Sequence, residues 1–439
     1  MTPIITGIIG IILFFLLLSI KIPIALAMAM VGLGGFACLI SPAAAFQMTA
    51  SEIYSVFSSY SLSVIPMFIW MGFLAYHSGI GGNLFHLAYK LLGHLPGGLA
   101  VATQATCALF GAVCGSNTAT AATIGAIALP EMRKYHYNDS LSTASVAAGG
   151  ALGVLIPPSI IFIVYGIATE QSIGRLFLAG ILPGILLMSL YMITIYILAA
   201  RRPELGPPGP KAPWRERIVA LRGGLLEVLI IFTVSLCGLI AGWFTPTEAG
   251  AVGAAGVLLV ALLEHRLNWE QFVRSLADTT RTAAMIMLLV AGATVFGRFI
   301  AVSRLPFALA DWAGSLPLPS FLILTVVFLI YLVLGCFIDA LALVLLTVPI
   351  FFPLVVDVLG YDPVWFGVII VMVVAMGIIT PPVGMNVYII KGVAKDIPLE
   401  VIFKGIWPFL AALAVCFFLL TLFPQIATFL PSLFATGSG

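Results

Sequence analysis

The chain has 439 residues, of which 62% are hydrophobic and only 8% charged, and its mean hydropathy is +1.19. Soluble domains carry about 25% charged residues, so this composition indicates a protein embedded in a lipid bilayer. A net charge of +2 gives no basis for nucleic-acid binding, and six isolated cysteines without a CxxC pair favour neither a metal site nor a disulfide framework.

The first half of the chain, residues 1–200, is predicted to contain membrane spans, one amphipathic helix and one helical hairpin. Several apolar runs reach the roughly 20 residues that cross a bilayer. In chain order the predicted helices are 4–20, 23–40, 60–77, an amphipathic segment at 82–94, an apolar pair at 98–113 and 119–131, and a long helix at 174–200.

The apolar pair forms a predicted re-entrant hairpin, 98–134. Its two arms are each shorter than a full span and meet at residues 115–118, and basic residues at 133–136 place both ends on the cytoplasmic side. The following helix contains Pro157 and Pro158. One proline in a helix interior costs about 3 kcal/mol, so two adjacent prolines predict a helix that is broken within the membrane.

The segment 201–222 is the only long polar stretch, and it separates two halves of similar length. Its six basic residues predict a cytoplasmic loop by the positive-inside rule. They are Arg201, Arg202, Lys211, Arg215, Arg217 and Arg222.

The second half, 223–439, repeats the order of the first. Its predicted elements are 223–243, 247–263, 282–300, an amphipathic 304–314, a hairpin 319–354, a helix broken at Pro381-Pro382, and 404–424. With five spans plus one hairpin in each half, the second half enters the membrane from the opposite side. The sequence therefore predicts an all-α polytopic membrane protein of two inverted repeats, with both termini periplasmic. Counting the spans in this way places Arg298 and Arg304 on the periplasmic side, as exceptions to the positive-inside rule. The predicted core spans contain no arginine that would indicate a binding site for a substrate carboxylate.

Paired interruptions at corresponding places in two halves are typical of secondary transporters, whose binding sites lie at broken helices near the membrane midplane. Irregular backbone at this depth is tolerated only where protein encloses it or a wet cavity adjoins it. Unwinding frees carbonyl oxygens, and hairpin tips add hydroxyls and amides, which together suit a hard cation and an anionic substrate.

We expect two sites. The first joins the hairpin residues Ser116, Asn117 and Thr118 with Gly150, Gly153 and the Pro157-Pro158 break. The second joins Gly335 and Asp339 with Gly377, Thr380 and Pro381, with Asn386 just beyond. The expected substrate-binding residues are Ser116, Asn117, Thr118, Pro157, Pro158, Thr380 and Asn386. The expected cation ligands are Ser116, Asn117, Gly150, Gly153, Gly335, Asp339, Gly377, Thr380 and Pro381.

We expect different roles for two acidic residues, Asp339 and Glu248. A carboxylate at the centre of a membrane helix costs roughly 2.5–3.5 kcal/mol, so Asp339 should be paired or bind a cation. Glu248, by contrast, begins a helix in FTPTEAGAVG at 244–253, where capping is the favoured role. The chain contains no HExxH, GxSxG or GxxxxGK[ST] motif, so neither an enzyme nor direct ATP coupling is predicted.

These motifs resemble the large membrane subunit of tripartite ATP-independent periplasmic (TRAP) transporters, the DctM-like permeases. The resemblance covers nearly the whole chain. It rests on GSNTATAATIG at 115–125 with ALPEM at 128–132, GALGVLIPPS at 150–159, FTPTEAGAVG at 244–253, GCFIDALALVLLTVPIFFP at 335–353 and GIITPPVGMN at 377–386.

The resemblance implies a Na⁺-driven importer of a carboxylate-bearing solute in a bacterial inner membrane, working by an elevator motion. It implies two further polypeptides: a small membrane subunit of about four helices and a periplasmic substrate-binding protein. Na⁺ is the implied coupling ion, and no cofactor is expected. The solute is a C4-dicarboxylate, a sialic acid or a similar organic acid.

Two alternatives remain open at this point. Ser-Asn-Thr at 116–118 is also similar to the hairpins of Na⁺/dicarboxylate symporters, so one alternative is a stand-alone symporter that needs no binding protein. The other is a passive channel, which net accumulation against a gradient would exclude.

Overall fold

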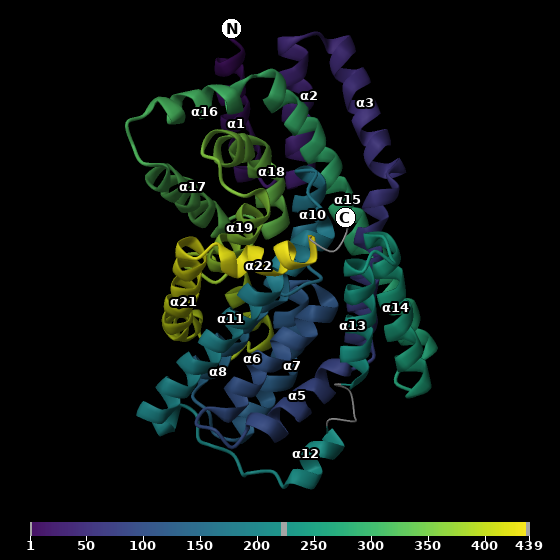
Figure 1. Cartoon of the computed structure of the whole chain (residues 1–439), viewed down its shortest axis with the longest axis vertical. Coiled ribbons are helices and arrows are strands. Elements are labelled where there is room, and N and C mark those ends of the chain that lie inside the picture. The colour runs from purple at the N-terminus through teal and green to yellow at the C-terminus, as the bar shows by residue number, and fades with distance from the viewer. Residues whose placement is uncertain (1, 221–225, 436–439) are drawn as a thin grey trace.

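The computed structural model describes residues 2–220 and 226–435, and over these residues the chain is helical with no strand (Figure 1). Seven of the described helices are long and apolar enough to cross a membrane. The boundary predicted between residues 222 and 223, with Arg222, lies outside the described residues.

The helices of the first half precede the polar linker. They are α1 (Pro3–Ser19), α2 (Ile24–Leu39), α3 (Pro42–Ser58), η1 (Tyr60–Ser63), α4 (Val64–His77), α5 (Ile80–Leu92), α6 (Gly98–Cys114), α7 (Asn117–Lys134), α8 (Asp139–Gly150), α9 (Leu152–Leu155), α10 (Ile160–Ala168) and α11 (Ile173–Arg201).

The helices of the linker and the second half follow. They are η2 (Pro203–Leu205), α12 (Trp214–Ala220), α13 (Leu226–Ile240), α14 (Pro246–Leu263), α15 (Trp269–Val302), α16 (Leu305–Ser315), α17 (Ser320–Gly335), α18 (Ala340–Phe352), η4 (Pro353–Val358), α19 (Pro363–Gly377), α20 (Met385–Val393), α21 (Leu399–Leu422) and α22 (Gln425–Ala435).

Three helices differ from the sequence expectation. Helix α3 was not expected, because its residues are less apolar than those of a membrane-spanning helix. Ser41 caps its N-terminus and Pro42 occupies its first turn, which favours the start of a helix at this point. Helix α15 has 34 residues and extends well before the expected 282–300, because an Asn268–Gln271 capping box starts a polar first turn ahead of the apolar run. Helix α22 was not expected either, and it packs on α11.

The long helix α15 is the axis of one body of the molecule. Helices α2, α3 and α4 all pack against it, while α14 packs on α4 and α13 on α14. At the crossing of α2 and α15, a Cβ on Gly32 would lie 2.8 Å from the backbone oxygen of Val295, so the two backbones are in direct contact. Small residues allow this close approach between helices in membranes.

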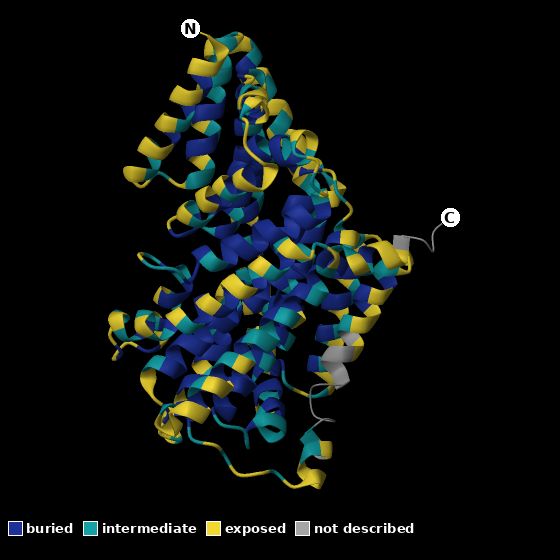
Figure 2. Ribbon diagram, turned by 60° about the vertical axis from the view of Figure 1, so that its left-hand side comes forward, coloured by how far each residue is buried: buried dark blue, intermediate teal, exposed yellow. Residues whose placement is uncertain are grey.

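The second body contains the two hairpins and the two interrupted helices. Helices α6 and α7 form the first hairpin, and α17 and α18 form the second. The interrupted helices pass through the interior of the molecule, where buried residues gather (Figure 2). Residues 141–155 and nearly all of α19 are buried. Broken backbone is therefore enclosed by protein, as its unpaired polar groups require.

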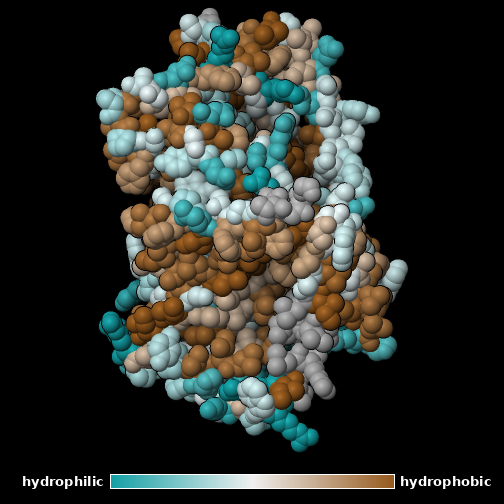
Figure 3. All heavy atoms as spheres, viewed as in Figure 1, coloured by the Kyte–Doolittle hydropathy of each residue, from teal (hydrophilic) through white to brown (hydrophobic). Residues whose placement is uncertain are grey.

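The polar linker is attached to the base of the first hairpin. The amide of Gly97 donates to the Gly206 carbonyl at 3.0 Å, and the amide of Asn138 donates to the Leu205 carbonyl at 3.0 Å. Lys90 of α5 and Glu216 of α12 form an ion pair at 2.5 Å. The described part of the linker is thus attached to the body that contains the hairpins. Hydrophilic residues gather at this lower end of the molecule (Figure 3).

Substitution of Gly32 by alanine is expected to lower the melting temperature of the purified chain. The new methyl would meet the α15 backbone at 2.8 Å, where no side-chain rotation relieves the clash, and such overpacking costs typically 1–3 kcal/mol. The matched control is Gly34→Ala on the same helix, where no atom lies within 4 Å of the new Cβ. Equal melting temperatures for the two variants would contradict the direct contact between α2 and α15.

Candidate functional site

The first hairpin tip, residues 115–118, lies against the first break, residues 156–159. Gly115 has φ +61°, a conformation that glycine adopts without strain, and a Cβ there would lie 2.6 Å from the Pro158 carbonyl oxygen. The Ile160 amide donates to the Gly115 carbonyl at 3.4 Å. Tip and break are therefore held together through their backbones. The Pro157-Pro158 bond is cis, as is the Pro381-Pro382 bond.

Asn117 connects the first hairpin tip to the second half of the chain. Its amide nitrogen donates to the side-chain oxygen of Asn386 at 3.1 Å, and the Asn386 amide nitrogen donates to the Ala147 carbonyl at 3.0 Å. Asn386 is fully buried, and Asn117 is 6% exposed. Gly150 leaves room for this pair, because a Cβ on it would lie 2.7 Å from the Asn386 amide nitrogen.

The other residues expected at the first site divide into two groups. Gly153 abuts the hairpin, since a Cβ on it would lie 2.7 Å from the Ser116 carbonyl oxygen. The Ser116 hydroxyl accepts from the Ala119 amide at 3.4 Å and so caps α7. Thr118 is exposed, with its hydroxyl 3.4 Å from the Asn117 side-chain oxygen. In the structure Ser116 and Asn117 thus lie next to Gly150 and Gly153, while Thr118 lies at the exposed edge of the first site.

Two buried hydroxyl groups beside the first hairpin tip were not predicted from the sequence as site residues. Thr120 is fully buried, and its hydroxyl would lie 2.5 Å from a Cβ on Gly153. Ser159 is also fully buried, and its hydroxyl has no hydrogen-bond partner among the described residues. Both belong to the motifs already quoted. Thr120 follows Ser116 by four residues on one helix face, and Ser159 follows the Pro-Pro pair directly.

The second hairpin tip, residues 335–339, meets the end of α19 directly before the second break, residues 378–384. A Cβ on Gly377 would lie 2.7 Å from the Gly335 Cα. Asp339 is half-buried and caps α18, accepting the Leu341 amide at 3.1 Å. No cationic side chain among the described residues pairs with it. The Thr380 hydroxyl donates to the Met376 carbonyl at 2.6 Å, leaving its oxygen lone pairs free.

Asn386 lies beside both sites. Its backbone amide donates to the Ile378 carbonyl of the second break at 3.0 Å, which agrees with the expected place just beyond the second site. Its side chain contacts the first hairpin and α8, which the sequence did not predict. Glu248 has the capping role that was expected, since it forms a capping box with Thr245 at the start of α14. Pro381 follows Thr380 directly in the second break.

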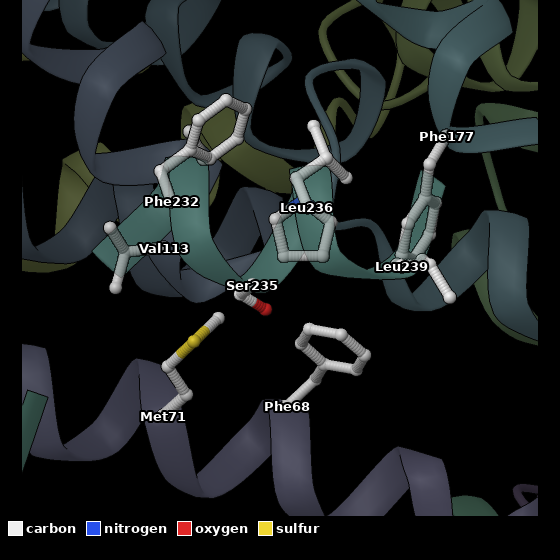
Figure 4. A pocket seen from close by; sticks show the side chains of 10 residues that line it. Phe68, Met71, Val113, Phe177, Phe232, Ser235, Leu236 and Leu239 are labelled. Atoms are coloured by element: carbon white, nitrogen blue, oxygen red, sulfur yellow. The ribbon is translucent and has the colours of Figure 1, made fainter. Parts of the chain in front are cut away.

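Two hollows lie between the two bodies. The smaller, about 10 Å³, is bounded by apolar side chains from α4, α6, α11 and α13 and by Pro158 of the first break, with Ser235 between Phe68 and Met71 (Figure 4). The Ser235 hydroxyl donates to the Ala249 carbonyl at 2.7 Å, and the volume of this hollow is far below the roughly 300 Å³ at which small-molecule sites begin.

The larger cavity has a volume of about 460 Å³ and lies between α3 and α15 on one side and α10 and α18 on the other. Small-molecule sites are typically about 300–1,000 Å³. Its charged residues are Glu52, Glu170 and Arg298. This cavity could not be predicted from the sequence, because Glu52 lies in the unexpected helix α3 and Arg298 is only an isolated basic residue near the periplasmic end of the predicted span 282–300.

Removal of either amide of the Asn117–Asn386 pair is expected to destabilise the chain. Asn386→Ala leaves the Ala147 carbonyl and the Asn117 amide without a partner in a buried place, at a cost of about 1–3 kcal/mol. The double variant Asn117→Ala/Asn386→Ala should lose less free energy of unfolding than the two single variants lose together, because both single substitutions remove the same hydrogen bond. Strict additivity in thermal unfolding would contradict the bridge.

Comparisons with known proteins agree with this architecture. The DctM component family of tripartite ATP-independent periplasmic transporters matches residues 11–426. The chain is 35% identical to the C4-dicarboxylate TRAP transporter large permease protein of Pseudomonas aeruginosa, over 87% of this chain and 89% of that protein. It is 34% identical to the ectoine TRAP transporter large permease protein of Halomonas elongata, over 95% and 97%.

A solved structure shares the fold. The YdaH transporter of Alcanivorax borkumensis superposes with a TM-score of 0.60 over 87% of this chain and 88% of that one, at 16% identity. The family match extends over nearly the whole chain, and the relatives are covered over most of their own length. The chain is therefore a polytopic membrane protein, not an enzyme, and belongs to the DctM family of large permease subunits of TRAP transporters.

Proposed function

We propose that this permease imports a carboxylate-bearing solute by Na⁺ symport across a bacterial inner membrane. The observation that carries the proposal is the paired arrangement of hairpin tip and helix break. In each half, glycines bring the hairpin tip into backbone contact with the broken helix at or next to its break, at Gly115 and Gly153 in the first half and at Gly335 and Gly377 in the second. Helix ends and unpaired carbonyls at such positions suit ions and anionic substrates.

The proposed first cation site is built from Ser116, Asn117, Gly150 and Gly153. The unpartnered Ser159 hydroxyl adds an oxygen beside it. Carbonyl, amide and hydroxyl oxygens are the ligands that hard cations prefer. In this proposal the first break, Pro157-Pro158, and Thr118 face the substrate.

The proposed second cation site is built from Gly335, Asp339, Gly377, Thr380 and Pro381. Asp339 supplies the charge: it lies at a helix N-terminus without a cationic partner among the described residues, so a bound Na⁺ would neutralise it. Thr380 and Asn386 would also contact the substrate.

The proposed transport cycle is an elevator motion of the hairpin body along the body built on α15. The described linker supports this division, because its hydrogen bonds tie it to the first hairpin rather than to α13 or α14. A small membrane subunit and a periplasmic binding protein would complete the transporter, and both termini of this chain would be periplasmic.

The coupling energy sets the smallest useful number of ions. Moving one charge through 100 mV is worth about 2.3 kcal/mol. A dianion entering a negative interior with one Na⁺ works against the potential, whereas two Na⁺ neutralise it. With a monoanion, two Na⁺ make uptake electrogenic and driven by the potential.

Na⁺ should raise the melting temperature of the purified chain, relative to K⁺ at equal ionic strength, because a ligand of the folded state stabilises it by mass action. Asp339→Asn should reduce this rise, since asparagine keeps the helix cap and removes the charge. Asp339→Ala separates the effect of the charge from that of the helix cap. This variant should also lose the N-terminal cap of α18 and should therefore melt at a lower temperature in both NaCl and KCl. An Asn variant with an unchanged response to Na⁺ would exclude Asp339 as a ligand.

Uptake into proteoliposomes that contain the chain and its small subunit should require an added binding protein. The similarity of Ser116-Asn117-Thr118 to the hairpins of Na⁺/dicarboxylate symporters makes a stand-alone symporter the second candidate. Na⁺-driven accumulation of succinate by the chain without a binding protein would favour that candidate, and accumulation only with the binding protein would exclude it.

A further inference from the structure

The larger cavity contains an arginine whose surroundings leave most of its guanidinium unused. Arg298 of α15 donates from Nε to Glu52 Oε1 of α3 at 2.6 Å. Neither of its terminal nitrogens has a hydrogen-bond partner among the described residues. The Arg298 side chain is 61% exposed, while the Glu52 side chain is only 15% exposed. Glu52 thus holds the guanidinium in place and leaves its outer edge open.

The outer edge of a guanidinium matches the oxygens of a carboxylate or sulfonate. Its planar N–H groups bind such groups in a bidentate manner, and pre-positioning lowers the entropy lost on binding. Here the contact is through Nε, which orients the side chain and spares both terminal nitrogens.

The opposite wall of the cavity limits the charge of the bound molecule. Arg298 neutralises Glu52, so the remaining charge of the described lining is that of Glu170, an exposed residue just after α10. A second negative charge on the solute would be repelled by this carboxylate, whereas a cationic group would be attracted to it. The cavity therefore favours a solute with a single acidic group over a dianion.

We propose that Arg298, positioned by Glu52, binds the single carboxylate or sulfonate of a monoanionic or zwitterionic solute, and that Glu170 discriminates against dicarboxylates. The proposal rests on the proposed transport function and names its substrate class. The cavity lies between the two proposed moving bodies, and the helices that line it, α3, α10, α15 and α18, lie away from the linker helix α12 (Figure 1). In the proposed orientation a solute would enter it from the periplasmic side.

The test uses the full chain co-purified with its small subunit, in Na⁺ buffer, with three probes added separately: N-acetylneuraminate, ectoine and succinate. The concentration dependence of the melting temperature gives an apparent affinity for each probe. The variants are Arg298→Gln, Arg298→Lys and Glu170→Gln. The matched control is Arg304→Gln, an exposed arginine at the same end of the molecule that does not line the cavity.

We expect N-acetylneuraminate or ectoine to bind the wild type at least tenfold more tightly than succinate. Arg298→Gln should weaken that binding about tenfold or more, Arg298→Lys should restore part of it, and Arg304→Gln should leave it unchanged. Glu170→Gln should strengthen succinate binding severalfold. If Arg298→Gln fails to fold, Glu52→Gln/Arg298→Gln removes both charges together and serves in its place.

The same samples distinguish this proposal from the symport proposal. The rise in melting temperature with Na⁺ alone should persist in Arg298→Gln, because the proposed cation ligands are at the hairpin tips. A wild type that responds to Na⁺ but to none of the probes, or an Arg298→Gln variant with unchanged probe affinity, overturns the assignment of Arg298 and leaves symport intact. Tighter binding of succinate than of both other probes overturns the charge preference.

Discussion

The structure depends on one constraint: polar backbone that leaves a helix at membrane depth must be enclosed by protein. Both Pro-Pro breaks free carbonyl and amide groups in the interior of the molecule. Each break is covered by the tip of a hairpin from its own half, and the contact is close because glycines face it, as at Gly377 and Gly335. Without this cover the freed groups would face lipid, where each unsatisfied group costs several kcal/mol. The same enclosure concentrates oxygen atoms, which is what a cation site requires.

The two halves are joined by side chains as well as by their common core. The Asn117–Asn386 bond links the first hairpin tip to the helix that follows the second break. At the base of the first hairpin, Arg133 donates to Asp396 at 2.6 Å, which links the end of α7 to the loop after α20 and lowers the pKa of the Asp396 carboxyl. That pair is solvent-exposed and contributes little stability, whereas the amide bridge is buried and fixes the relative position of the two halves. In the proposed elevator cycle the moving body would have to keep both proposed sites in register, and the amide bridge would supply such a link.

Much of this architecture could be predicted from the sequence, because proline and glycine act locally. The Pro-Pro pairs at 157–158 and 381–382 predicted the breaks, and the residues around Gly115 and Gly335 predicted the hairpin tips. What the sequence could not predict depends on tertiary contacts. Asn386 lies just beyond the second break, as expected, but its side-chain contact with the first hairpin was not predicted, because that contact depends on the pairing of the halves that brings α20 against α7 and α8. Helix α3 has too few apolar residues to be recognised as a span, and the cavity at Glu52 and Arg298 was missed with it.

The central claim is that each half provides one Na⁺ site at its hairpin tip. Equilibrium binding of radioactive Na⁺ to the purified chain tests this directly. The account predicts saturation near two Na⁺ per chain in the wild type and near one in Asp339→Asn. Saturation at the same number of ions in both proteins, or no saturable binding in the wild type, would contradict it.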